Sequence, residues 1–188
     1  MKIIVPVKIL KAHNIIKGTR ETNLALNGVF ITKDQIISSD GKLLLVSENK
    51  LNPRQRADYL VKIDHIPAGV SMAVIDTDMQ LCYFLDRIVS HSTLADIDLT
   101  EQFKAVSGAR VLRYPYPDVR PHMAMTHGAI SSVKLSAHVL GKITALTKAI
   151  GSRTGEVELN FQKEKTGTIN AVIRQGATVL SLFLKPMK

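Results

Sequence analysis

Lysine and arginine side chains gather at the two ends of this 188-residue sequence, where they could bind a polyanion through its phosphate groups. The first twenty residues carry five basic side chains and no acidic one, and the last sixty-nine carry ten basic against three acidic. The residues between them have a net charge of −3, whereas the whole chain has +9. A chain that is basic only for solubility has no reason to segregate charge in this way, so the pattern indicates a functional basic surface.

Two helices and their flanking residues would present this charge. We expect one helix near residues 9–17 and a second over 136–150. The second has apolar residues at 139, 140, 143, 146 and 150, which fall in an arc of about 120° and predict a core-facing stripe. The opposite arc of this helix carries small and basic residues and no acidic one. The candidate phosphate-binding residues are Lys8, Lys11, Lys17, Arg20, Lys142, Lys148 and Arg153.

The strands predicted around each helix follow a common order. Strands are expected at 3–7, 24–32, 35–39 and 42–47 near the first helix, and at 157–161, 169–173 and 179–184 after the second. Both ends therefore fit a repeated β-α-β-β-β unit of antiparallel strands, which predicts an α+β fold. The middle of the chain favours strands at 59–64, 70–75, 81–85 and 110–114, with a short helix near 100–105.

A proline-rich segment separates the two units. Residues 114–121 read Tyr-Pro-Tyr-Pro-Asp-Val-Arg-Pro and hold three of the seven prolines, which restrain the backbone to extended conformations. We predict a first domain at 1–113, a connector at 114–128 and a second unit at 129–188.

The chain resembles the bacterial DNA polymerase sliding clamp, the β subunit of the replicase. The resemblance rests on three stretches: Asn27-Gly28-Val29-Phe30-Ile31 with the later Ser38-to-Leu43 stretch, the Tyr-Pro-Tyr-Pro-Asp-Val-Arg sequence at 114–120, and the segment from Val133 to the Pro-Met-Lys tail. The chain is shorter than the family's usual subunit, so a ring would need more copies, or the protein is a diverged relative that forms none.

This resemblance implies basic helices on one face of antiparallel sheets, duplex DNA as partner, and a processivity role in DNA replication without catalysis. It also implies a homo-oligomer and partners such as a DNA polymerase or clamp loader. The candidate phosphate-binding lysines would face the DNA backbone without reading bases. The residues expected near a cleft for partner peptides are Leu182, Leu184, Pro186 and Met187.

Two other function classes remain open on the residues alone. Asp76 with Asp78, and Asp96 with Asp98, are spaced to place paired carboxylates on one side of a strand, where they could hold Mg²⁺ in an enzyme acting on nucleic acid. Aspartate is also common in turns, which is the simpler interpretation. The third class is a phage-type structural or protein-interaction module whose basic ends contact an acidic partner.

Other constellations predict no site. His122, His127 and His138 lack the regular spacing and fourth ligand of a zinc site, and His91-Ser92 has no nucleophile elbow around it. The glycine-rich loops that bind ATP or nicotinamide nucleotides are missing from the sequence, so no cofactor is expected. The single cysteine, Cys82, and an amino-terminal apolar stretch too short for a signal peptide or a membrane span suit a cytoplasmic protein.

Overall fold

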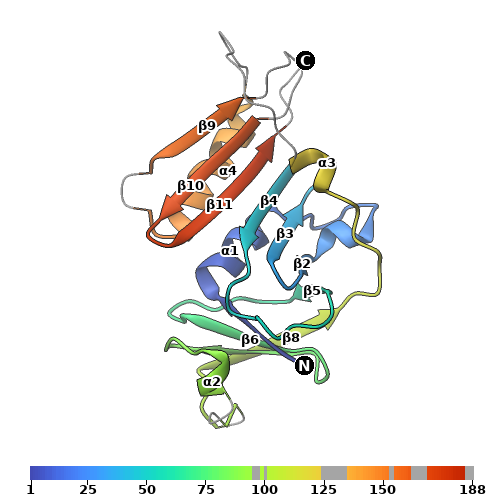
Figure 1. Cartoon of the computed structure of the whole chain (residues 1–188), viewed down its shortest axis with the longest axis vertical. Coiled ribbons are helices and arrows are strands. Elements are labelled where there is room, and N and C mark those ends of the chain that lie inside the picture. Colours follow the sequence, from blue (N-terminus) through green and yellow to red (C-terminus); the bar gives the residue numbers. More distant parts are fainter. Residues whose placement is uncertain (95–97, 100, 124–134, 153–154, 162–168, 185–188) are drawn as a thin grey trace.

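The computed structural model of the chain describes residues 1–94, 98–99, 101–123, 135–152, 155–161 and 169–184 (Figure 1). The first half contains β1 (Lys2–Pro6), α1 (Val7–Ile16), a 3₁₀ helix η1 (Leu24–Asn27), β2 (Val29–Ile31), β3 (Gln35–Ser39), β4 (Leu43–Glu48), β5 (Tyr59–Ile63), β6 (Met72–Asp76) and β7 (Leu81–Leu85). The second half contains α2 (His91–Leu94), β8 (Ala105–Val111), α3 (Arg120–Met123), α4 (Ala137–Ala149), β9 (Val157–Phe161), β10 (Ile169–Gln175) and β11 (Thr178–Leu184).

Within these residues, eleven strands form one continuous antiparallel sheet in the order β1-β6-β7-β8-β5-β2-β3-β4-β11-β10-β9. The amino-terminal and carboxy-terminal parts of the chain join where β4 pairs with β11, with Leu45 opposite Leu182. Within the amino-terminal part, β8 joins two groups of strands. Its first residues, 105–108, pair with β7, and its last residues, 109–111, pair with β5. Over the residues that the structure describes, the outermost strands of the sheet are therefore β1 and β9.

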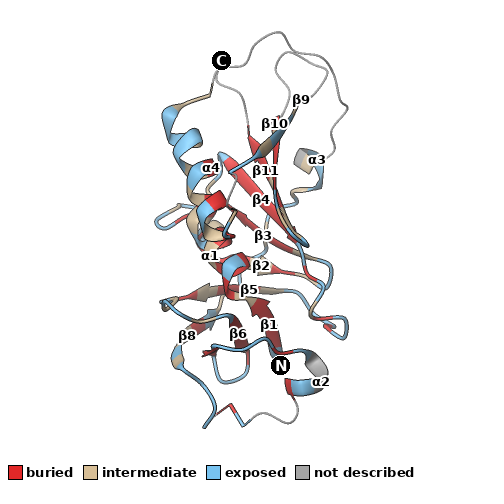
Figure 2. Ribbon diagram, turned by 90° about the vertical axis from the view of Figure 1, so that its left-hand side faces the viewer, coloured by how far each residue is buried: buried red, intermediate tan, exposed pale blue. Residues whose placement is uncertain are grey.

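The helices α1 and α4 lie side by side on one face of this sheet, as Figure 2 shows from the side. Their apolar faces pack on side chains from β1 to β8, β10 and β11 and form the main core with them. This core includes Leu10, Ile16, Leu146 and Leu182. Burial of this contiguous apolar surface is the main stabilising contribution to the fold.

Two smaller clusters cover the opposite face. Around α2, Leu94 and Leu99 pack on Tyr83 and Val74 of the β1-β6-β7 region. On β2, β3, β4 and β11, the proline-rich connector lies across the sheet, and Tyr116 stacks on Phe30 with ring centroids 4.7 Å apart. The described part of the predicted connector, residues 114–123, is thus packed against the sheet.

The predicted α+β class with antiparallel sheet is confirmed, and α1-β2-β3-β4 and α4-β9-β10-β11 share the expected element order. Ser136 caps α4 by accepting a hydrogen bond from the Val139 amide, and Gly151 at φ +74° ends it. The first strand of the second repeat, and part of the predicted connector, fall outside the described residues. The domain boundaries at 113 and 128 stay a prediction.

Three local predictions were wrong. The strand expected at 24–32 begins only at Val29, because Asn23 accepts a hydrogen bond from the Ala25 amide and starts η1 instead. The helix expected near 100–105 does not form over its described part, where the Lys104 amide donates to the Phe84 carbonyl and Ala105 begins β8. The strand predicted at 110–114 is only the end of β8.

Candidate nucleic-acid interface

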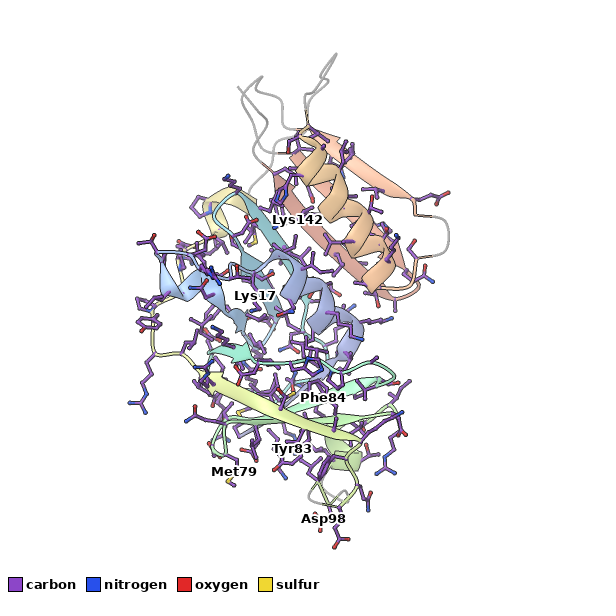
Figure 3. The ribbon with its side chains drawn as sticks, turned by 180° about the vertical axis from the view of Figure 1, so that it is seen from behind. Lys17, Met79, Tyr83, Phe84, Asp98 and Lys142 are labelled. Atoms are coloured by element: carbon purple, nitrogen blue, oxygen red, sulfur yellow. The ribbon has the colours of Figure 1, made fainter. Side chains whose placement is uncertain are left out.

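A concave groove of about 510 Å³ runs between α1, α4 and the segment that follows β5. Lys11, Asn14 and Ile15 line it from α1, and Ala145, Lys148 and Ala149 line it from α4. Residues 63–66 form its third wall. Figure 3, turned by 180° from Figure 1, shows both helices in front of the sheet. We call this concavity the basic groove. The fold therefore brings one candidate lysine from each unit to the same concavity, although they are 137 positions apart in sequence.

The helix geometry explains why these side chains point outward. Lys8 and Lys11 lie three residues apart on α1, so they project from neighbouring turns of the same face. Lys8 is exposed and Lys11 is half-buried beside the groove. The small Ala145 and Ala149 keep the α4 wall low next to the exposed Lys148. A rod-shaped polyanion could approach such a surface closely.

One carboxylate, that of Asp64, also lies at the basic groove. Its Oδ1 accepts a hydrogen bond from the Arg110 Nη2 at 3.0 Å, so its charge has a partner on β8. Gly108 makes room for it, because a Cβ at that position would lie 2.5 Å from the Asp64 Oδ2. This pairing offsets the repulsion that Asp64 would exert on a phosphate.

Lys17 and Arg20 follow the end of α1. Lys17 is half-buried, and burial lowers the pKa of its amine; the nearby Lys62 lowers it further, while Asp64 acts in the opposite direction. Arg20 is exposed. Neither residue lines the basic groove. Arg153 lies outside the described residues.

Lys142 does not line the basic groove and is paired with a carboxylate instead. Its Nζ lies 2.6 Å from the Asp40 Oδ2 in the turn between β3 and β4, and their side chains are 18% and 14% exposed. Burial alone would raise the pKa of Asp40, but hydrogen bonds from Lys142 and from the Leu43 and Lys42 amides together bring it below its usual value. Lys142 thus joins α4 to the first unit.

The buried face of α4 also differs from the apolar stripe that the sequence predicted. Leu140, which the sequence assigned to the core stripe, is 50% exposed, whereas Ile143, Leu146 and Ile150 are buried as expected. The arrangement of basic helices on one face is therefore only partly what the sequence predicted: Lys8, Lys11 and Lys148 are outward-facing, and Lys142 is engaged with Asp40.

A buried histidine that the sequence reasoning missed fixes α1 to the sheet. His13 is fully buried, with its Nδ1 2.9 Å from the Ser38 Oγ and its Nε2 2.8 Å from the Ser47 Oγ. Burial lowers its pKa to about 3, so the ring is neutral and one serine donates while the other accepts. The signal was its position on the apolar face of the predicted helix, between Leu10 and Ile16.

A second groove, of about 190 Å³, lies on the opposite face of the sheet beside the connector. Its walls are Pro117, Asp118 and Val119 of the connector, the end of β11, the turn between β3 and β4, and Leu26 of η1. Leu184 and Phe183 both contribute to it, whereas Leu182 is fully buried in the main core. Pro186 and Met187 lie outside the described residues. We call this depression the connector groove.

Of the two carboxylate pairs, only Asp76 with Asp78 lies fully within the described residues, and both of its carboxylates are engaged with neighbouring groups. The Asp76 Oδ1 accepts hydrogen bonds from the Asp78 and Met79 amides, and the Asp78 Oδ2 pairs with the terminal amine of Met1 at 2.5 Å. Asp98 is exposed and Asp96 is outside the described residues. In the described part of the chain, no three His, Cys, Asp or Glu side chains are grouped so that they could hold a metal ion.

The remaining candidates occupy separate places. His138 is exposed on α4, His91 begins α2, His122 lies in α3, and His127 is outside the described residues. Cys82 is buried in β7, and burial raises the pKa of its thiol, which keeps it protonated and unreactive. None of the helices in the described residues is both long enough and apolar enough to cross a membrane.

Comparison with known proteins identifies the fold. No protein-family model matches the sequence, and no curated protein matches it. Among solved structures, the DNA polymerase III β subunit from Borrelia burgdorferi in complex with a natural product matches with a TM-score of 0.59 and 12% identity. The DNA polymerase sliding clamp from Pseudomonas aeruginosa matches with a TM-score of 0.58 and 8% identity, and its griselimycin-bound form with 0.54 and 6%.

Each of these matches covers the whole of the present chain, but only 63%, 67% and 65% of the respective solved chains. The chain thus spans about two thirds of the length of these sliding clamps. At this low identity the likeness establishes the fold, and it confirms the resemblance drawn from the sequence at that level.

Proposed function

We propose that this chain, which has the fold of the bacterial sliding clamps, is a clamp-like protein that holds duplex DNA through its phosphate backbone. The observation that carries the proposal is that α1 and α4 pack side by side and direct Lys11 and Lys148 into one basic groove, with Lys8 exposed on the same helix. We further propose that Lys17, Arg20 and Arg153 extend this positive surface.

The chemistry of this surface suits binding without sequence recognition. Ammonium groups attract phosphate oxygens irrespective of the bases, and rigid helices hold them at fixed spacing. Lys142 contributes to this function by positioning α4, since its charge is matched by Asp40. The proposed role is one of binding rather than catalysis, as in a replication processivity factor.

The salt dependence of binding tests the proposal. Wild-type protein should bind duplexes of unrelated sequence equally, with an affinity that falls steeply as salt rises. The double variant Lys11→Glu/Lys148→Glu should lose roughly tenfold or more in affinity, and the slope of log K against log [salt] should become shallower by about 2, because each phosphate contact contributes about 0.9. Fluorescence anisotropy with labelled duplexes measures both quantities.

A charge-matched variant controls for the change in net charge. Lys33→Glu/Arg56→Glu makes the same substitution at two exposed residues outside the basic groove and should retain most of the affinity. Equal losses in the two double variants would show that binding follows net charge alone, and the proposed interface would then be wrong.

We also propose that the connector groove receives an apolar peptide segment of a partner such as a DNA polymerase or clamp loader. Leu184, Phe183, Val119 and Pro117 give it apolar walls, and the connector is held over the sheet by the Tyr116–Phe30 stack. Apolar concavities with a few polar groups are the usual form of ligand sites. Griselimycin, with which one of the structurally similar clamps was solved, supplies a probe.

Two leucines of η1 provide a matched test of this second site. Leu26 lines the connector groove, whereas Leu24 is exposed two residues away and does not line it. Leu26→Asp should abolish binding of griselimycin measured by calorimetry, and Leu24→Asp should preserve it. If wild-type protein fails to bind the probe, or if both variants bind it equally, the assignment of this groove fails.

A further inference from the structure

Two basic residues of the sheet face each other close to the basic groove. Lys62 of β5 and Arg110 of β8 are directly opposite in the antiparallel ladder, so their side chains share one face of the sheet. Like charges in this arrangement repel each other and destabilise a sheet. The pair therefore requires a negative charge close by, supplied either by the chain or by a ligand.

A third cation approaches this pair from the end of α1. Lys17, labelled in Figure 3, is half-buried, and the charge of Lys62 adds to the effect of burial in lowering the pKa of its amine. We call Lys17, Lys62 and Arg110 the cation cluster. The sequence reasoning selected only Lys17, because Lys62 and Arg110 lie in the middle of the chain, where acidic residues outnumber basic ones.

One carboxylate, that of Asp64, lies among these cations. Its Oδ1 accepts a hydrogen bond from the Arg110 Nη2 at 3.0 Å, and its charge opposes burial and Lys62 in their effect on the pKa of Lys17. Over the residues that the structure describes, no other carboxylate forms an ion pair with a member of the cation cluster. Three positive charges thus share a single negative charge.

Backbone contacts fix Asp64 between the cation cluster and the basic groove. The Asp64 amide donates to the Gly108 carbonyl at 3.0 Å, and the His65 amide donates to the Ser107 Oγ at 3.0 Å. The carboxylate lies against the backbone of Gly108, where a Cβ would be 2.5 Å from its Oδ2. Because Asp64 also belongs to the wall of the basic groove, it borders both features.

The ion pair of Asp64 with Arg110 is open to exchange. The two side chains are 47% and 59% exposed, and ion pairs at such exposed positions contribute little net free energy. A phosphate diester offers the same kind of acceptor oxygens, and a guanidinium can bind them through two parallel hydrogen bonds. Arg110 can therefore replace the carboxylate with a phosphate at little cost.

We propose that Lys62 and Arg110 bind a backbone phosphate of the same duplex that the basic groove holds, and that Asp64 competes with this phosphate as the resident counter-ion of the cation cluster. This inference rests on the proposed function, because it extends the DNA interface from α1 and α4 onto the sheet. Asp64 holds the like charges together when no DNA is bound. Bound DNA supplies the negative charge instead, and the carboxylate then turns toward solvent.

The affinity of the full chain for a labelled duplex at low salt, measured by fluorescence anisotropy, tests the competition. Asp64→Asn removes the competing carboxylate and should increase affinity about threefold or more. Asp34→Asn makes the same change in net charge at an exposed aspartate outside the basic groove and the cation cluster, and should change affinity by less than about 1.5-fold.

Neutral substitutions test the phosphate contact itself. Lys62→Gln/Arg110→Gln should lower affinity about fivefold or more and make the slope of log K against log [salt] shallower by about 1, as expected for one lost phosphate contact. Lys33→Gln/Arg56→Gln, at two exposed residues elsewhere, should retain most of the affinity. Lys62→Arg/Arg110→Lys, which conserves both charges, should retain most of it as well. Adding Asp64→Asn to Lys62→Gln/Arg110→Gln should no longer increase affinity, because the carboxylate then has no phosphate site to compete for.

The outcomes separate this inference from the proposed function. If the double variant of the basic groove weakens binding as proposed but Lys62→Gln/Arg110→Gln does not, the DNA interface stands and its extension onto the sheet is wrong. If Asp64→Asn and Asp34→Asn raise affinity equally, Asp64 is not a specific competitor. Duplex binding that is absent, or that neither double variant weakens, would overturn both proposals.

Discussion

Lys142 on α4 and Asp40 in the turn between β3 and β4 form an ion pair of 2.6 Å across the junction of the two repeated units. Both side chains are largely buried, and Asp40 also accepts hydrogen bonds from the Lys42 and Leu43 amides of its own turn. A lysine that the sequence marked as a phosphate ligand therefore fixes the helix that carries Lys148. The same contact links the position of one half of the basic groove to the first unit.

Lys142→Met should lower the free energy of unfolding by about 1–3 kcal/mol, because it leaves a mostly buried carboxylate without its cation. Urea denaturation at neutral pH measures the loss. Lys50→Met removes the partner of Glu48 in a pair whose side chains are 74% and 62% exposed, and should change stability by less than about 0.5 kcal/mol. Equal effects of the two substitutions would contradict the structural role of Lys142.

The same substitution has a pH signature. The pKa of Asp40 is lower in the folded protein than its ordinary value of 3.8, so the stabilisation is present above that value and is lost as pH falls through the folded-state pKa. The stability difference between wild type and Lys142→Met should therefore shrink in acid. A difference that stays constant from pH 7 to pH 3 would exclude this linkage.

His13 predicts a separate acid sensitivity at higher pH. Its folded-state pKa of about 3 lies below its ordinary value of 6.5, so between these values the unfolded chain binds the proton and the folded chain does not. Stability should fall as pH drops through this window, with a slope of up to about 1.4 kcal/mol per pH unit. Urea denaturation at pH 7, 6, 5 and 4 measures the slope.

His13→Gln should flatten this slope, although it should also lower stability at pH 7 because the contacts with Ser38 and Ser47 change. Asn14→Gln, on the exposed side of the same helix, should keep the wild-type slope. A slope in His13→Gln as steep as in the wild type would mean that other groups cause the acid sensitivity.

Local patterns in the sequence were sufficient for much of the fold. The strands at 35–39 and 81–85 were predicted with their observed bounds, and the alternation of apolar and polar residues from 156 to 162 predicted the strand observed at 157–161. The helix α4 was predicted within one residue at each end from its cap, its periodicity and Gly151. Two of the three wrong predictions have a clear cause: at 24–32 the Asn23 side chain accepts from the Ala25 amide and starts η1, and at 100–105 the Lys104 amide donates to the Phe84 carbonyl of a distant strand.

The site was less accessible to sequence reasoning because its decisive contacts join distant residues. Lys142 and Asp40 are 102 positions apart, and Asn52 and Ile4 are 48 apart. Helical periodicity placed Lys142 opposite the core stripe, but the partner that draws it inward lies in another unit. Phe183 and Leu182 lie on opposite faces of β11. The alternation of residues in the sequence could not show that the connector would cover the face that carries Phe183.

Asn52 offers a test of how the β1 edge is closed. Asn52→Ala leaves the amide and carbonyl of the fully buried Ile4 without their partners and should lower the free energy of unfolding by about 2–5 kcal/mol. Asn23→Ala, which removes one hydrogen bond at the partly exposed start of η1, should cost only about 1 kcal/mol. Thermal unfolding of the two variants compares them, and similar losses would mean that Asn52 is not an essential edge partner.

Tyr116 predicts opposite outcomes for two substitutions at one position. Its ring stacks on Phe30 with an interplanar angle of 5°, while its hydroxyl is buried with no hydrogen-bond partner among the described residues, and burial raises its pKa. Tyr116→Phe should keep or slightly increase stability, because an unsatisfied hydroxyl is removed and the stack remains. Tyr116→Ala should lower stability by about 2–4 kcal/mol and detach the connector from the sheet.

Since Pro117 and Val119 form one wall of the connector groove, only the alanine variant should also lose griselimycin binding. Calorimetry on both variants decides the matter: unchanged binding in Tyr116→Ala would show that the stack does not position that wall.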